Sequence, residues 1–109
     1  YSASKAGVSM LSRQLAYEWG PRGVRSNVVS PGLVRTALSE AFYTDEKTRA
    51  ARQKVVPQRR IGRVDDIADA VLYFASERTS YVTGEEIIID GGYAQTLMSH
   101  VPRPGFNDD

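Results

Sequence analysis

The stretch that decides the fold is VRSNVVSPGLVRT, residues 24–36. Its first half holds three valines, and β-branched side chains of this kind favour an extended strand. Ser30-Pro31-Gly32 follows as a turn, because proline lacks a backbone N–H and glycine tolerates conformations that other residues avoid. The stretch therefore predicts a strand over residues 24–29 that ends in a turn.

Segments with helical periodicity lie on both sides of this strand. Small and apolar residues recur every three or four positions over residues 1–19, which predicts a helix. Gly20-Pro21-Arg22-Gly23 ends it, since proline breaks the hydrogen-bond ladder and glycine accepts a positive φ. A second helix is predicted over residues 64–75, where Asp65 and Asp66 complement the helix dipole. The apolar stripes are Ala3, Ala6, Gly7, Met10, Leu11 and Leu15 in the first helix and Val64, Ile67, Ala68, Val71, Leu72 and Ala75 in the second.

A second strand is predicted at Ile87-Ile88-Ile89, an apolar run without alternation that is typical of a strand covered on both faces. Asp90-Gly91-Gly92 ends it. The order helix, strand, long excursion, helix, strand indicates an α/β fold with a parallel sheet. Two strands are too few for such a sheet, so we expect residues 1–109 to form a single partial domain whose missing part precedes Tyr1.

Composition excludes several classes of protein. The chain has 109 residues, of which 41% are hydrophobic and 25% charged, with a formal net charge of +1, as expected for one soluble packed domain. It has no cysteine and one histidine, so we expect no disulfide and no metal site, and we assign His100 to the surface or to packing. No apolar run approaches the roughly 18 residues that cross a bilayer, so no membrane partner is expected. The near-neutral charge disfavours a nucleic-acid module, although arginine outnumbers lysine eleven to three.

Tyr1 and Lys5 are the first candidates for chemistry. They are four residues apart, so on a helix both side chains point to the same side. A lysine ammonium beside a phenol favours the phenolate, and lowering the phenol pKa from about 10 to about 7 needs roughly 4 kcal/mol. Taken alone, the pair is better explained as two surface side chains, because six tyrosines and three lysines give this spacing by chance in roughly one chain in six.

An ordered set of motifs follows the pair. These motifs are NVVSPGLVRT at residues 27–36, Gly62-Arg63, Thr83-Gly84 and Asp90-Gly91-Gly92. As a set, they resemble the C-terminal portion of a short-chain dehydrogenase/reductase, and the resemblance extends to about Gly92. It implies a doubly wound, parallel-sheet fold of the Rossmann type that binds NAD or NADP. It also implies an oxidoreductase that interconverts a ketone or oxoacyl group and a secondary alcohol.

The same resemblance implies roles for individual residues. Tyr1 is the general acid or base that exchanges a proton with the substrate oxygen. Lys5 holds the hydroxyls of the nicotinamide ribose and lowers the pKa of the phenol. The Pro31-Gly32 turn lets the backbone approach the cofactor. The main chain at Val34 meets the nicotinamide carboxamide, and the Thr36 hydroxyl bonds to the carboxamide or the pyrophosphate.

By the same resemblance, residues 37–61 correspond to the family's variable substrate loop, and we expect them to be partly helical and mobile. Seven basic residues and no acidic residue lie between Lys47 and Arg63. This segment suits an anionic substrate or an acidic acyl carrier protein, as in the 3-oxoacyl-(acyl-carrier-protein) reductases that the chain also resembles. A solvated basic face is the plainer alternative. Residues 93–109 are expected to form an irregular C-terminal tail.

Several parts of the family pattern do not occur in this chain. It holds no glycine-rich phosphate loop and no catalytic serine upstream of Tyr1, so we expect the chain alone to be inactive. By analogy with the family we expect a homotetramer or homodimer, and the absence of cysteine favours a cytoplasmic location. A non-catalytic protein of the same fold, acting in binding or assembly, is the alternative. Asn27 is expected to bond to local backbone.

Overall fold

A computed structural model describes residues 2–96 and 104–105. The chain divides into two compact units. Unit 1 comprises Tyr1–Ser30 and Asp65–Ile89, and unit 2 comprises Pro31–Val64 and Asp90–Asp109. His100 and most of the predicted C-terminal tail lie outside the described residues.

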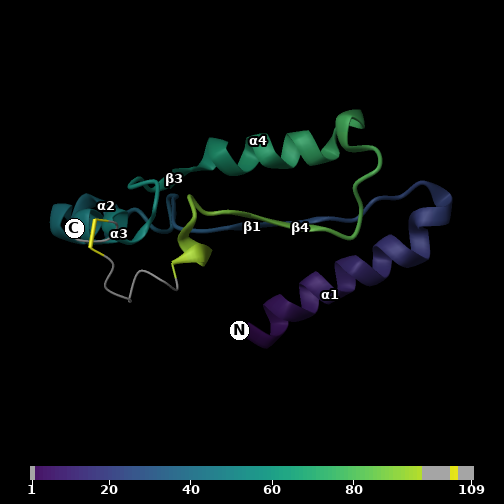
Figure 1. Ribbon diagram of the computed structural model, residues 1–109, viewed down its shortest axis with the longest axis horizontal. Coiled ribbons are helices and arrows are strands. Elements are labelled where there is room, and N and C mark those ends of the chain that lie inside the picture. The colour runs from purple at the N-terminus through teal and green to yellow at the C-terminus, as the bar shows by residue number, and fades with distance from the viewer. Residues whose placement is uncertain (1, 97–103, 106–109) are drawn as a thin grey trace. The chain divides into compact units, whose positions relative to one another are not determined.

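Unit 1 is built on the strand pair β1 (Val28–Pro31) and β4 (Glu86–Ile89). Helix α1 (Ser2–Trp19) lies on one side of this pair, and helix α4 (Val64–Ala75) lies on the other (Figure 1). A short 3-10 turn follows each helix. These turns are η1 (Gly20–Arg22) and η2 (Glu77–Thr79). Two strands between helices are the arrangement that the order of elements predicts.

The predicted helices and their ends are confirmed. α4 has the predicted bounds, with Asp65 and Asp66 in its first turn. α1 ends at Trp19, and after η1 the chain turns at Gly23 with φ 78°, the left-handed conformation expected of a glycine at this place. Sequence patterns of this kind are local, which is why both helix ends could be predicted.

The first strand begins later than its valines predict. β1 starts at Val28 and includes Pro31, which was expected in the turn. Residues 24–27 bond instead to the chain between the end of α4 and β4, largely through side chains. For example, the Arg25 guanidinium donates to the C=O of Phe74 at 2.9 Å. The prediction was wrong because side-chain bonds to distant residues replace the strand ladder here.

Asn27 bonds to backbone that is distant in the sequence. Its Nδ2 donates to the C=O of Val82 at 3.0 Å, and its Oδ1 accepts the N–H of Glu85 at 3.1 Å. The amide therefore holds the start of β1 beside the segment that leads into β4. The expected bonding to backbone is confirmed, whereas the expected local partner is wrong, since tertiary pairing brings these segments together.

β4 confirms the strand predicted at Ile87-Ile88-Ile89, but its exposure alternates. Ile88 is 51% exposed, whereas Ile87 and Ile89 are half-buried. Among the described residues, therefore, only one face of this strand is covered, and the expected cover on both faces is not found there.

Helix α4 carries apolar residues on two faces. Ile67, Ala70 and Phe74 are half-buried and share one helical face. Val64 and Leu72, which belong to the predicted apolar stripe, are exposed in the described chain. A helix that is apolar on both sides has more apolar surface than one packing partner can cover.

Unit 2 contains two very short parallel strands and two helices. In its sheet, Val34 of β2 (Val34–Arg35) lies opposite Gly62 of β3 (Gly62–Arg63). Helices α2 (Ala41–Thr44) and α3 (Glu46–Val55) lie between these strands in the sequence. The partly helical character expected of residues 37–61 is confirmed. β2 and β3 were missed, because two residues are too short to produce a period. The 3-10 turn η3 (Tyr93–Gln95) follows Asp90-Gly91-Gly92.

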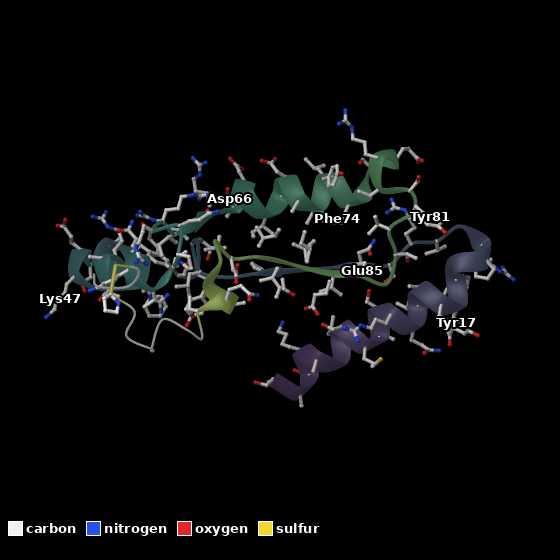
Figure 2. All side chains as sticks on the ribbon, viewed as in Figure 1. Tyr17, Lys47, Asp66, Phe74, Tyr81 and Glu85 are labelled. Carbon is white, nitrogen blue, oxygen red and sulfur yellow. The ribbon has the colours of Figure 1, made fainter. Side chains whose placement is uncertain are left out.

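Few side chains are buried within the described residues. The buried apolar side chains are Ala16, Tyr43 and Val56. Tyr17 is 82% exposed and points away from the strands in Figure 2, and Leu38 is 96% exposed. Much apolar surface of this chain is therefore accessible. In the part of the chain that the structure describes, no helix combines the length and the apolar character needed to cross a bilayer.

Candidate functional site

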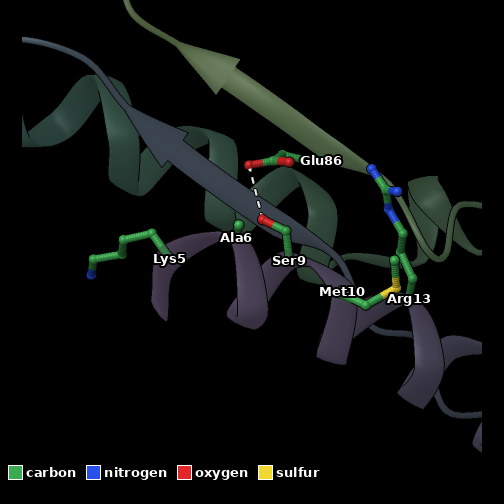
Figure 3. Close-up of a pocket in the computed structure, with 6 residues that line it drawn as sticks. All are labelled: Lys5, Ala6, Ser9, Met10, Arg13 and Glu86. Carbon is green, nitrogen blue, oxygen red and sulfur yellow. Dashed lines mark hydrogen bonds between the residues drawn. The ribbon is translucent and has the colours of Figure 1, made fainter. Parts of the chain in front are cut away.

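Lys5 lies near the start of α1, on an exposed part of unit 1. It lines an open hollow of about 440 Å³ (Figure 3). Tyr1 lies outside the described residues, so its pairing with Lys5 stays a prediction. The helix that this pairing requires is present from Ser2 onward. The other residues that line the hollow are Ala6, Ser9, Met10, Arg13 and Glu86.

Glu86 is the carboxylate of this hollow and joins three elements of unit 1. Its Oε1 accepts hydrogen bonds from Ser9 Oγ of α1 at 3.3 Å and from Ser30 Oγ of β1 at 2.7 Å. Figure 3 shows the bond to Ser9, with the arrows of β1 and β4 pointing in the same direction, as predicted for a parallel sheet. The first turns of α1 are thereby tied to both strands beside Lys5.

The face of α1 toward the strands is small and polar. Ser12 Oγ and Ser26 Oγ lie 2.8 Å apart in a hydrogen bond, and Ser12 and Ala16 are buried. Met10 and Leu11, which belong to the predicted apolar stripe, are more than half exposed in the described chain. The apolar stripe correctly indicates a helix. However, hydrogen bonds of serine hydroxyls hold this helix against the rest of unit 1, and the spacing of apolar residues does not reveal such bonds.

In unit 2, Gly32 lies against Asp90, while Pro31, which was expected in a turn with it, is the last residue of β1. Gly32 and Asp90 are the residues that follow β1 and β4, and the carboxyl ends of neighbouring parallel strands meet at one edge. A Cβ built on Gly32 would lie 2.4 Å from Asp90 Cβ and 2.8 Å from its Cα. Glycine is therefore required here by the close approach of Asp90. The predicted approach of the cofactor to this turn stays a prediction.

Val34 and Thr36 belong to a hydrogen-bonded turn with Ser39. Ser39 Oγ donates to the C=O of Val34 at 2.9 Å and accepts the N–H of Thr36 at 2.9 Å. The N–H of Ser39 donates to Thr36 Oγ1 at 3.3 Å. Thr36 Oγ1 and Ser39 Oγ also lie 3.1 Å apart in a hydrogen bond, and because Ser39 Oγ gives its proton to Val34, Thr36 is the donor in this bond. Ser39 was missed, since it carries no signal apart from its spacing of three from Thr36.

Two carboxylates order the chain after Thr36. Glu40 pairs with Arg35, whose hydrogen bonds hold the pKa of Glu40 below its usual value. Asp45 accepts the backbone N–H of Thr48 at 3.2 Å and caps α3. Hydrogen bonds from Thr48, chiefly from its hydroxyl, lower the pKa of Asp45. Both carboxylates are therefore ionised at neutral pH and hold the segment that enters α3.

Arg52 of the basic segment is engaged with aromatic side chains. Its guanidinium lies 4.1 Å from the ring centre of Phe42, and its Nη1 donates to Tyr43 Oη at 3.1 Å. Tyr43 is 2% exposed. Arg52 therefore packs α2 against α3, which is a role that the run of basic residues in the sequence does not indicate.

Arg59 of the same segment closes the end of α3. It has φ 57°, and its guanidinium donates to the backbone C=O groups of Lys54 and Val56. A cation on these carbonyls opposes the negative end of the helix dipole. The basic segment thus combines arginines bound to their own chain with exposed lysines, of which Lys47 points outward from α3 in Figure 2.

The candidate site residues are divided between the two units. Pro31-Gly32, Val34 and Thr36 belong to unit 2. So do Asp90, which the motif set contains but to which it gives no role, and Ser39, which the sequence did not indicate. Lys5 belongs to unit 1, with Glu86 as a further residue that was missed. Within residues 2–96 and 104–105, no three carboxylate or imidazole side chains gather into a group that could hold a metal ion.

Comparison with known proteins identifies the family. The profile of the family described as "Enoyl-(Acyl carrier protein) reductase" matches residues 1–94. The chain is 48% identical over 93 residues to a sorbose reductase of Schizosaccharomyces pombe, which covers 85% of this chain. It is 41% identical over 92 residues to 3beta-hydroxysteroid dehydrogenase 1 of Eggerthella lenta, which covers 84% of this chain. The chain spans 35% of the length of each of these relatives.

Solved structures show the same fold. A 4-hydroxyisoleucine dehydrogenase mutant complexed with NADH and succinate matches 87% of this chain with a TM-score of 0.82 and 30% identity. A 2-deoxy-D-gluconate 3-dehydrogenase from Agrobacterium tumefaciens, described as putative and with NADP bound, matches 87% of this chain with a TM-score of 0.80 and 35% identity. The chain covers 39% of each of these two structures. With its α/β architecture and ordered motifs, this chain belongs to the short-chain dehydrogenase/reductase family.

Proposed function

We propose that the chain is the C-terminal part of an NAD(P)-dependent oxidoreductase that interconverts a ketone or oxoacyl group and a secondary alcohol. The observation that carries this proposal is the ordered motif set, Tyr1-x-x-x-Lys5 followed by the Pro31-Gly32 turn and Thr36, in a chain of this family. Similar proteins include dehydrogenases complexed with NADH or NADP. The chain alone, which spans about a third of its relatives, is proposed to be inactive.

The donors in unit 2 fit a nicotinamide cofactor. The Thr36 hydroxyl is exposed and bonds to Ser39, and it would turn its proton from Ser39 Oγ to a carboxamide or phosphate oxygen of the bound cofactor. The main chain at Val34 and the Pro31-Gly32 turn would hold the nicotinamide end of the cofactor. Lys5 would hold the ribose hydroxyls, because an ammonium offers three donors. The bound cofactor supplies or accepts the hydride.

Tyr1 and Lys5 would carry the proton chemistry. In reduction, the phenol O–H of Tyr1 donates its proton to the substrate oxygen as negative charge develops there. In oxidation, the Tyr1 phenolate takes the proton of the alcohol. The positive charge of Lys5 stabilises the phenolate and lowers the pKa of Tyr1, so that both forms are accessible near neutral pH.

Replacing Tyr1 by phenylalanine tests this function directly. In the full-length protein, Tyr1→Phe should lower the rate of nicotinamide-dependent turnover by about 100-fold or more, because the proton donor is lost. Cofactor binding, measured by nicotinamide fluorescence, should survive in the variant. The wild type would be assayed with a panel of ketones and secondary alcohols, using NADH, NADPH and their oxidised forms. A wild type that binds neither cofactor and turns over no compound in the panel would leave the assembly role as the better explanation.

The proposed substrate is a small carbonyl or alcohol compound, with an acyl-carrier-bound form as the variant that the basic segment favours. Exposed lysines on α3 support that variant, since they offer positive charge to an acidic carrier protein. A homotetramer or homodimer is part of the proposal, supported by the exposed apolar residues Val64 and Leu72 of α4. We also propose a cytoplasmic location, which rests on the absence of cysteine from the chain.

A further inference from the structure

The Asp90-Gly91-Gly92 turn of unit 2 is crowded on several sides. A Cβ on Gly91 would lie 2.8 Å from Val56 Cγ1, and one on Gly92 would lie 3.1 Å from Pro57. On another side, Asp90 leaves no room for a Cβ on Gly32. The turn therefore touches both the Pro31-Gly32 turn and the chain that follows α3.

Hydrogen bonds fix the turn in this position. Asp90 Oδ1 accepts the N–H of Gly92 at 2.9 Å, and Oδ2 accepts the N–H of Ala94 at 2.7 Å. The C=O of Gly91 accepts the N–H of Gln58 at 3.2 Å. Gly91 and Gly92 have φ values of 64° and 94°, which residues with a side chain rarely adopt. Shape, hydrogen bonds and backbone conformation thus all specify this turn.

The Asp90-Gly91-Gly92 turn differs from the chain around Gly20 and Gly23 in how little space surrounds its glycines. Gly23 also has a positive φ, 78°, but no atom lies within 4 Å of a Cβ built there. Gly20 likewise has open space at its Cβ position. A left-handed conformation alone therefore explains Gly23, whereas Gly91 must in addition leave room for Val56, a side chain that is 3% exposed.

We propose that Asp90, Gly91 and Gly92 are positioning residues that set the Pro31-Gly32 turn for the cofactor and the end of α3 for the substrate. This inference rests on the proposed function. A side chain at residue 32 would clash with Asp90 and displace the loop that would meet the nicotinamide. A side chain at residue 91 would clash with Val56 and displace the segment that contains it. The two displacements should therefore affect different steps, cofactor binding in the first case and substrate binding in the second.

The experiment compares crowded and open glycines in the full-length protein. Gly32→Ala, with Gly20→Ala as its control, should raise the Kd of NADH or NADPH on the order of tenfold, because a displaced contact of about 1 Å has effects of this size or larger. Gly91→Ala, with the positive-φ control Gly23→Ala, should raise the KM of a compound that the wild type turns over by a similar factor. The Kd of the cofactor should change less than twofold in Gly91→Ala and in both controls.

A rescue variant tests the contact between Gly91 and Val56. Val56→Ala removes the Cγ1 atom that a Cβ on residue 91 would meet, so the variant with both changes should recover part of the KM lost in Gly91→Ala. Where Gly32→Ala fails to fold, Asp90→Asn replaces it, since the amide keeps the shape of the side chain but loses one of its two acceptor oxygens. This variant should raise the Kd of the cofactor by a few-fold.

The proposal is overturned if the crowded variants lower the melting temperature but match their controls in Kd and KM. It is also overturned if the effects of Gly91→Ala and Val56→Ala on KM are additive in the double variant. A wild type without cofactor binding would instead reject the proposed function. In that case, hydrogen exchange at the Gln58 amide still tests the positioning role of Gly91, because this amide donates to the C=O of Gly91. Exchange should be faster in Gly91→Ala than in Gly23→Ala, and equal rates would reject the role.

Discussion

Arg25 in unit 1 and Arg52 in unit 2 both anchor their unit, but with different partners. Arg25 donates to four acceptors between the end of α4 and β4, which are the C=O groups of Phe74, Ser76 and Val82 and the hydroxyl of Thr79. Arg52 lies over the ring of Phe42 and donates to the hydroxyl of Tyr43. Arg25 therefore bonds mainly to backbone acceptors, whereas Arg52 contacts aromatic side chains.

This difference decides what is lost when each arginine is removed. The three carbonyls also accept neutral donors, since the Thr79 hydroxyl bonds to Phe74 and Ser76 and the Asn27 amide bonds to Val82. Without Arg25 they lose their charged donor in a half-buried place. The ring of Phe42 needs no hydrogen-bond partner, and it is already 47% exposed. Removing Arg25 should therefore destabilise the protein more than removing Arg52.

The largest effect is expected for Arg25→Ala. Loss of its charged hydrogen bonds should lower the free energy of unfolding by about 3 kcal/mol. Arg25→Lys should recover less than half of this, because an ammonium cannot reach four acceptors with the planar geometry of a guanidinium. Urea denaturation followed by circular dichroism measures both changes. Arg78→Ala, an exposed arginine of η2, is the control and should stay within about 0.5 kcal/mol of the wild type. Equal losses in Arg25→Ala and Arg78→Ala would contradict the anchoring role.

A smaller effect is expected for Arg52→Ala. The ring contact and one hydrogen bond should together contribute about 1–2 kcal/mol. Arg52→Lys should keep part of this value, since an ammonium can also lie over the Phe42 ring. The same denaturation experiment applies, with Lys54→Ala as the control on the exposed side of α3. If Arg52→Ala proved as damaging as Arg25→Ala, the proposed distinction between backbone and aromatic partners would be wrong.

Much of the fold could be predicted because its signals are local. The bounds of α4, the end of α1 near Gly23 and the strand at Ile87-Ile88-Ile89 all follow from period, turn residues and end charges. β2 and β3 could not be predicted, because two-residue strands form only when distant segments meet. For the same reason, the valines at residues 24–29 predicted a strand that begins too early. Residues 24–27 have hydrogen-bond partners more than 45 residues away, which the local sequence does not reveal.

The candidate site divides in the same way. The motif order indicates Lys5, the Pro31-Gly32 turn and Thr36 from the sequence alone. It does not indicate Glu86, and it includes Asp90 without a role, because each acts by contact with a residue distant in the sequence. A carboxylate that accepts hydroxyl or backbone N–H groups has no distinguishing neighbours in the sequence. Such residues become visible only when β1 and β4 lie side by side, with Glu86 at the start of β4 and Asp90 directly after its end.

The smallest effect is expected from reversing charge on the basic segment. This change tests whether its lysines attract an acidic carrier protein or are only solvated. Lys47 and Lys54 are exposed and seven residues apart, so they share one face of α3. Reversing both to glutamate should raise the KM of an acyl-carrier-bound substrate by about three- to tenfold at low salt, and less at high salt, because exposed charges act at long range and are screened. The KM of a small neutral ketone should stay within about twofold of the wild type, since no charge meets it.

Two further variants complete this test. Replacing Lys47 and Lys54 by glutamine should give about half of the effect, since charge is removed without reversal. Arg59→Glu should raise the KM of both substrates, because Arg59 holds the carbonyls at the end of α3 and its loss disturbs the segment for any substrate. Equal effects of the lysine reversals on both substrates would reject the steering of an acidic carrier protein. Arginines bound to their own chain and lysines exposed on α3 would then both be structural or solvated, and the basic run would carry no information about the partner.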